Sequence, residues 1–94
     1  MIVPKNPVDW LFRNRQTGQI TIAQLPNVPL AVFLTAATVR SLSDPSGWPG
    51  TALRATATTA LVWWAVDELL RGVNPWRRLL GGAVLAAQLA RLVT

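Results

Sequence analysis

The chain has 94 residues and a formal net charge of +5, and charged residues make up 14% of it. This length allows one domain at most, and the charged fraction is low against roughly 25% in a typical soluble domain. His, Cys and Tyr are absent and Met1 is the only methionine, which excludes a haem or an iron–sulfur cluster held by this chain alone.

The same composition leaves little for a metal site or for catalysis. Only four acidic residues are present, and no His or Cys is available to join them as zinc ligands. No nucleophile–base pair, glycine-rich phosphate loop or spaced pair of carboxylates is found. We therefore expect a protein that is not an enzyme and binds no cofactor and no metal. Its basic residues lie singly or in pairs beside apolar segments, which argues against nucleic-acid binding.

Residues 1–25 are predicted to form an amphipathic arm on a membrane surface. Asn6 is a candidate N-cap, Pro7 suits the first helical position and Asp9 suits the positive end of the helix dipole. The short helix is expected to end before Gly18, and residues 19–22 alternate as in an extended segment. A solvated arm fits the sequence equally well. The basic residues expected to meet anionic lipid are Lys5, Arg13 and Arg15.

The first predicted membrane span covers residues 26–43, which carry no charge from position 28 to position 39. A helix of this length rises about 27 Å, close to the roughly 30 Å hydrocarbon core of a bilayer. Arg40 is expected to pair with Asp44 one turn later. Residues 44–50 are rich in Pro and Gly and predict a turn.

The second and third predicted spans cover residues 51–71 and 75–93. Thr51 is a candidate N-cap for the second, and Gly72 follows its expected end. Asn74 is the candidate N-cap of the third. The charge-free middle of each is short for a span, so the charged side chains near the ends must snorkel to the membrane surface. The third segment either spans or lies half-immersed, and spanning is favoured.

The positions of the basic residues predict an orientation. Lys and Arg mark the cytoplasmic ends of membrane helices. They gather before the first segment and around the second connection, and they are sparse at the first connection. We therefore expect an N-terminus on the cytoplasmic side of a bacterial plasma membrane.

Charged residues at the second connection form the first candidate site. Charges in a span are often functional, as in a proton relay or a cation site. Ion pairing is the more economical interpretation, with Asp67 and Glu68 both within reach of Arg71 and with Arg77 and Arg78 across the turn. If the carboxylates do have a function, docking to a partner subunit is expected. The residues of this ion-pair or docking set are Asp67, Glu68, Arg71, Arg77 and Arg78.

The tryptophans are candidate anchors at the membrane interface. Trp63 and Trp64 are adjacent, so their side chains point about 100° apart on a helix. Two interpretations stay open. Both rings are interface anchors, or one ring faces lipid and the other faces a partner or a quinone-like ligand. The full set of candidate anchors is Trp10, Trp48, Trp63, Trp64 and Trp76.

Small residues in the third segment predict close helix packing. Helices associate in lipid through small residues that let backbones approach each other. Gly82, Ala86 and Ala90 recur at a spacing of four, with Ala83 and Ala87 beside them.

Two segments of the chain read DWLFRNRQTGQITIAQLPN and ALVWWAVDELLRGVNPWRRLLG, and the composition is rich in Ala and Arg and poor in Lys. In these segments and in this composition, the chain resembles small integral membrane proteins of high-GC actinobacteria. The resemblance lies in amino-acid composition and in short sequence segments. It implies a bacterial plasma membrane and brings no named function and no functional residues.

The predicted fold class is all-α, a small helical membrane protein with two to three short transmembrane helices and an N-terminal interfacial arm. The predicted function is that of a non-catalytic accessory or structural subunit of a larger respiratory or transport complex. The alternatives are a self-assembling protein (a small transporter, pore or holin-like protein) and a membrane-surface tether. The polar candidates for lining a pore are Thr35, Thr38, Arg54, Thr58 and Gln88.

Overall fold

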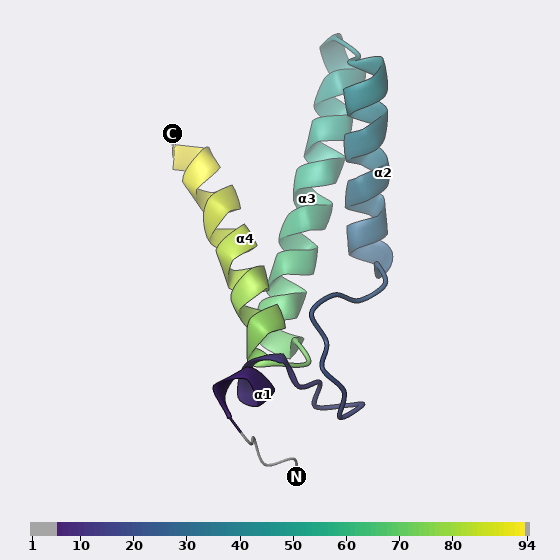
Figure 1. Cartoon of the computed structure of the whole chain (residues 1–94). Helices are drawn as coiled ribbons and strands as arrows, with labels where there is room; N and C mark the ends of the chain where they lie inside the picture. Colours follow the sequence, from purple (N-terminus) through teal and green to yellow (C-terminus); the bar gives the residue numbers. More distant parts are fainter. Residues whose placement is uncertain (1–5, 94) are drawn as a thin grey trace. The chain divides into compact units, whose positions relative to one another are not determined.

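The computed structural model describes residues 6–93 and contains four α-helices within them (Figure 1). The helices are α1 (Pro7–Phe12), α2 (Val28–Ser43), α3 (Gly47–Arg71) and α4 (Pro75–Val93). No strand forms among these residues, and Arg13 and Ile20 make only an isolated antiparallel bridge. The predicted all-α class is confirmed.

The chain divides into two compact units. The junction unit combines Met1–Leu25 with Ala65–Thr94, and the hairpin unit is Pro26–Trp64. Helix α3 contributes residues to both units. The sequence predicted one helical domain after the arm, whereas the structure groups the arm with the last third of the chain.

The short helix α1 begins as predicted. The Asn6 side chain accepts a hydrogen bond from the Asp9 N–H at 2.8 Å, and Pro7 occupies the first turn. The helix ends at Phe12, with Arg13 as its extended C-cap, before Gly18 as expected, although Gly18 is not the residue that ends it. Gly18 instead adopts φ +77° in the turn that follows, a conformation that favours glycine.

In the hairpin unit, α2 and the first part of α3 run antiparallel to each other (Figure 1). Helix α2 begins at Val28 because the Asn27 side chain caps it, accepting from the Leu30 N–H at 3.1 Å. Helix α3 begins at Gly47, not at the predicted cap Thr51. Pro49 lies in the first turn of α3, where a missing N–H costs no helical hydrogen bond, and therefore does not mark a break.

Small residues make up most of the buried part of the hairpin unit, and Trp64 at its end is buried as well. Ala36 of α2 and Ala57 and Ala60 of α3 are buried, as is Gly50. A Cβ at Gly50 would lie 2.2 Å from the Pro45 carbonyl oxygen, so only glycine fits there. Backbones separated by such small side chains can approach closely, which is the packing expected of helices in apolar surroundings.

Helix α4 packs against the end of α3 through Gly81. A Cβ on Gly81 would lie 2.6 Å from the Ala65 carbonyl oxygen and 2.7 Å from the Glu68 Cβ. A Cβ on Gly82 would lie 3.4 Å from Leu69 Cδ1, a much milder contact. Of these two adjacent glycines, Gly81 is therefore the one in close contact with α3.

None of the helices in the described part of the chain has the length and apolar character that a crossing of the membrane requires. Helix α2 has 16 residues, two fewer than predicted, and α3 carries Arg54 within its length.

Candidate functional site

Asn74 is the centre of a polar junction between the arm and α4. Its side chain is fully buried, with a relative exposure of 0%. Its amide nitrogen donates to the carbonyl oxygens of Phe12 and Thr21, both at 2.8 Å. Its amide oxygen accepts from the Arg77 N–H at 2.8 Å and so caps α4. One side chain thus holds two points of the arm and the first turn of a helix.

The arm reaches Asn74 through a tight turn. The Asn14 N–H donates to the Gln19 carbonyl at 2.7 Å, and the Thr21 N–H donates to the Phe12 carbonyl at 2.8 Å. The buried Asn14 side chain accepts from the Gln16 N–H at 2.7 Å, an Asx turn. Of the extended segment predicted over residues 19–22, the structure has an isolated bridge between Ile20 and Arg13 and no strand.

A buried ion pair joins the end of α3 to the start of α4. Arg77 Nη2 donates to Glu68 Oε1 at 3.0 Å, and the two side chains are 7% and 9% exposed. Arg77 Nη1 also donates to the Ile22 carbonyl at 3.2 Å. The sequence offered Glu68 a partner in Arg71 or, across the turn, in Arg77 and Arg78, and the pair that forms is with Arg77 because the turn brings it back onto α3.

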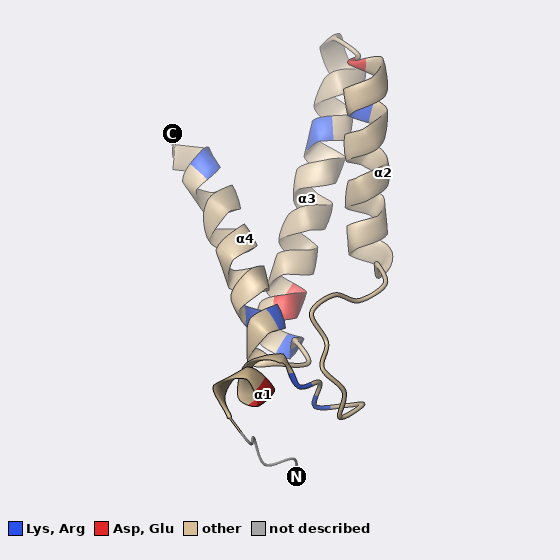
Figure 2. Cartoon of the chain, in the orientation of Figure 1, with Lys and Arg blue, Asp and Glu red and all other residues tan. Residues whose placement is uncertain are grey.

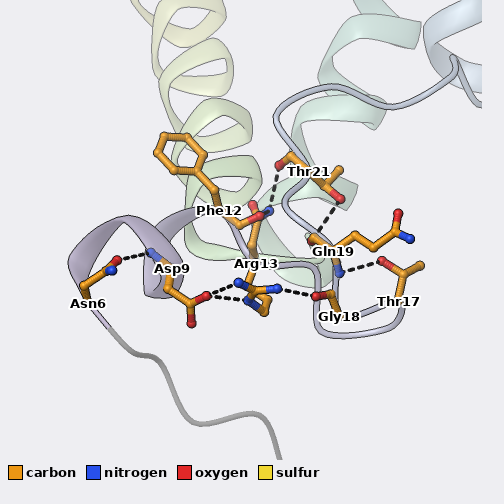
Figure 3. Close-up of polar contacts among 9 residues, drawn as sticks. Asn6, Asp9, Phe12, Arg13, Thr17, Gly18, Gln19 and Thr21 are labelled. Atoms are coloured by element: carbon orange, nitrogen blue, oxygen red, sulfur yellow. Dashed lines mark hydrogen bonds and ion pairs between the residues drawn. The ribbon is translucent and has the colours of Figure 1, made fainter.

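Two further ion pairs are local. Asp67 pairs with Arg71 on the exposed side of α3, as predicted. Asp9 pairs with Arg13, whose Nη1 also donates to the Gly18 carbonyl at 2.5 Å (Figure 3). Sequence analysis missed this pair, although a spacing of four residues in a helical segment was a signal for it.

Within the described residues, Arg40 and Asp44 form no ion pair, contrary to prediction. Asp44 instead ends α2 in the left-handed conformation, with φ +42°, and its N–H donates to the Arg40 carbonyl at 2.8 Å. The role of Asp44 in the structure is therefore that of a C-cap, which its backbone fulfils without an ion pair of the side chain.

Two arginines bind backbone carbonyls at the end of α3. Arg15 Nη2 donates to the Gly72 carbonyl, and the Arg15 N–H donates to the Val73 carbonyl at 2.8 Å. Arg78 Nε donates to the Leu69 carbonyl at 2.9 Å. Figure 2 shows basic residues on the arm and around the connection between α3 and α4. Lys5, the remaining basic residue of the predicted arm, lies outside the described residues.

A cavity of about 220 Å³ lies among these groups in the junction unit. Carboxylate, guanidinium, amide and indole side chains all contribute to its wall. Its lining residues are Asp9, Trp10, Arg13, Arg15, Asn74, Pro75 and Arg78.

The tryptophans differ in exposure. Trp63 is 60% exposed and Trp64 is 5% exposed, so the adjacent rings do point to different surroundings, as their helical spacing predicted. Trp76 donates from Nε1 to the Ile22 carbonyl at 2.9 Å and packs on Phe12, with ring centroids 5.7 Å apart. Trp76 therefore holds the arm. Trp10 and Trp48 are exposed, and the role of the set as interface anchors stays a prediction.

The predicted packing residues of α4 lie mostly on its exposed side. Ala83, Ala86, Ala87 and Ala90 are exposed, and Gly82 is half-buried. Gly81, which lies in close contact with α3, was not singled out from the sequence. The alanines remain candidates for contact with another protein.

An apolar groove runs along the hairpin unit, with a volume of about 380 Å³. It contains no charged residue. Its lining residues are Val28, Pro29, Val32, Ala55, Thr56, Thr59, Ala60 and Trp63.

The candidate pore-lining residues belong to both units and differ in exposure. Thr35 is exposed, and its hydroxyl donates to the Ala31 carbonyl of its own helix at 2.8 Å. Arg54 is exposed in the hairpin unit, whereas Gln88 is buried in the junction unit. Over residues 6–93, no group of three or more His, Cys, Asp or Glu is placed to hold a metal ion.

Comparison of the chain with protein-family models, with curated proteins and with solved structures found no match. The chain's own geometry therefore carries the functional argument.

Proposed function

We propose that this protein is a non-catalytic accessory subunit that packs its hairpin unit against a larger membrane complex of the respiratory or transport kind in a bacterial plasma membrane. The observation that carries the proposal is the apolar surface of the hairpin unit. Three large apolar side chains that line one groove are exposed, Val28 to 72%, Val32 to 39% and Trp63 to 60%. Continuous exposed apolar surface of this kind marks contact with another protein or with lipid.

The hydroxyl groups of the hairpin unit support the same proposal. Thr35, Ser43, Thr51 and Thr56 each donate to the carbonyl four residues earlier in their own helix. This back-bonding satisfies a hydroxyl without water, which suits apolar surroundings. A covering partner also removes the need for each helix to be long and apolar enough to cross the membrane alone.

The groove of the hairpin unit suits an apolar helix of the partner. Ala55 and Thr59 are small, so a second helix can approach closely there. The ion pairs of the junction unit, by contrast, form within the chain, and that of Glu68 with Arg77 holds α4 to α3. The cytoplasmic position of the arm and a contact of Trp63 or Trp64 with lipid or a quinone stay predictions.

The experiment is purification of the tagged full chain from its native membrane in a gentle detergent, with native electrophoresis and quantitative mass spectrometry. The proposal predicts one large complex at a fixed ratio. Val32→Ser, in the groove, should reduce that ratio by about tenfold, whereas Leu42→Ser, on the same helix outside the groove, should leave it unchanged.

Purification of the protein as a homo-oligomer or alone would contradict the proposal. A homo-oligomer would favour a self-assembling transporter or pore instead. Equal loss of the complex in both variants would show that general apolarity, not the groove, directs the association.

A further inference from the structure

The accessory role leaves the cavity of the junction unit unexplained. This cavity is lined by three guanidinium groups and one carboxylate, so its ionic side chains carry a net charge of two positive units. Arg13 pairs with Asp9. Among the described residues, Arg15 and Arg78 have no carboxylate partner. The positive charge of the cavity is therefore not balanced within this part of the chain.

Backbone contacts hold Arg15 and Arg78 in place without neutralising them. Arg15 donates to the Gly72 carbonyl, and Arg78 donates to the Leu69 carbonyl at 2.9 Å. A guanidinium group carries five N–H donors, and each of these contacts uses only one. The remaining donors of both side chains are thus available at fixed positions beside the cavity.

We propose that this cavity binds a phosphate group, supplied by the headgroup of an anionic phospholipid or by free phosphate. Planar guanidinium groups match the oxygens of phosphate in a forked arrangement. A phosphate group has more oxygens than a carboxylate group, so it is the better ligand for two guanidinium groups at one site. Trp10 and Pro75 give the cavity an apolar wall, against which the rest of a headgroup can lie. The site does not depend on the accessory role of the hairpin unit.

The test is calorimetric titration of the full chain in a neutral detergent with three probes. The probes are inorganic phosphate, short-chain phosphatidylglycerol and short-chain phosphatidylcholine. We expect phosphatidylglycerol to bind more tightly than phosphatidylcholine, and Arg15→Gln or Arg78→Gln to weaken that binding about tenfold. Arg91→Gln, at an exposed arginine near the end of α4, is the matched control and should bind as the wild type does.

The arms of the test separate the two sources of phosphate. Binding of phosphatidylglycerol that inorganic phosphate does not displace assigns a lipid headgroup. Binding of inorganic phosphate with the same dependence on Arg15 and Arg78 assigns free phosphate. Absence of binding by both anions, or equal loss in Arg91→Gln, would overturn the proposal.

The lysine variants cover the case in which a glutamine variant fails to fold, which circular dichroism would reveal. Arg15→Lys and Arg78→Lys keep the charge and lose the planar fork. Both are expected to bind more weakly than the wild type. Wild-type affinity in both lysine variants would overturn the assignment of a guanidinium site.

Discussion

At the scale of single residues, Asn74 does more than its sequence context predicts. The Asn-Pro pair identified it as a helix cap, and the structure confirms that role through its contact with the Arg77 N–H. Its two contacts with the arm join residues 53 and 62 positions apart, and no local pattern encodes them. Sequence analysis thus found the local function of this side chain and missed the long-range one.

Replacement of Asn74 tests the polar junction. Asn74→Asp keeps the capping oxygen but removes both N–H donors and sets a carboxylate against two carbonyl oxygens. We expect both Asn74→Asp and Asn74→Ala to lower the free energy of unfolding by about 2 to 4 kcal/mol. Chemical unfolding followed by circular dichroism measures the change. If Asn74→Asp is as stable as the wild type, the cap alone explains the residue and the junction account is wrong.

The ion pair of Glu68 with Arg77 predicts a contrast with that of Asp67 with Arg71. Glu68→Gln leaves a buried guanidinium without its counter-charge, which should cost about 3 kcal/mol of stability. Asp67→Asn breaks a pair whose arginine side chain is 78% exposed, so the expected loss is below about 1 kcal/mol. The same unfolding measurement compares them. Equal losses in the two variants would argue against a buried pair.

At the scale of elements, the helix-capping and helix-breaking residues decided which helix boundaries could be predicted. Asn6 with Pro7 and Asn74 with Pro75 marked two helix starts correctly, because proline at the first position needs no N–H partner. The start of α3 was missed since Pro49 and Gly50 were interpreted as a turn. Both are compatible with the first turn of a helix when the chain around them packs closely.

Two adjacent glycines of α4 offer a matched test of its packing on α3. Gly81→Ala would place a methyl group 2.6 Å from the Ala65 carbonyl oxygen, so we expect a loss of about 1 to 3 kcal/mol. Gly82→Ala meets only the flexible end of Leu69 and gains helix propensity, so its stability should be unchanged or raised by up to about 1 kcal/mol. Thermal unfolding of the two variants separates them. A destabilised Gly82→Ala beside a neutral Gly81→Ala would contradict the packing described.

At the scale of the whole molecule, the sequence predicted the all-helical class from its apolar segments and caps. It did not predict the division into two units, because that division depends on contacts between the arm and residues 65–93. The membrane spans were predicted from segment length with snorkelling charges. No helix among residues 6–93 combines the length and the apolar character of a membrane span, and the membrane location stays a proposal.

The most direct test of the accessory role is photo-cross-linking in the native membrane from a single reactive residue at position 32, in the groove of the hairpin unit. The matched position is Gln16, an exposed residue in the turn of the arm. The account predicts a cross-link from position 32 to one larger membrane protein, and none to that protein from position 16. A cross-link from position 32 only to a second copy of this chain, or to no protein at all, would contradict it.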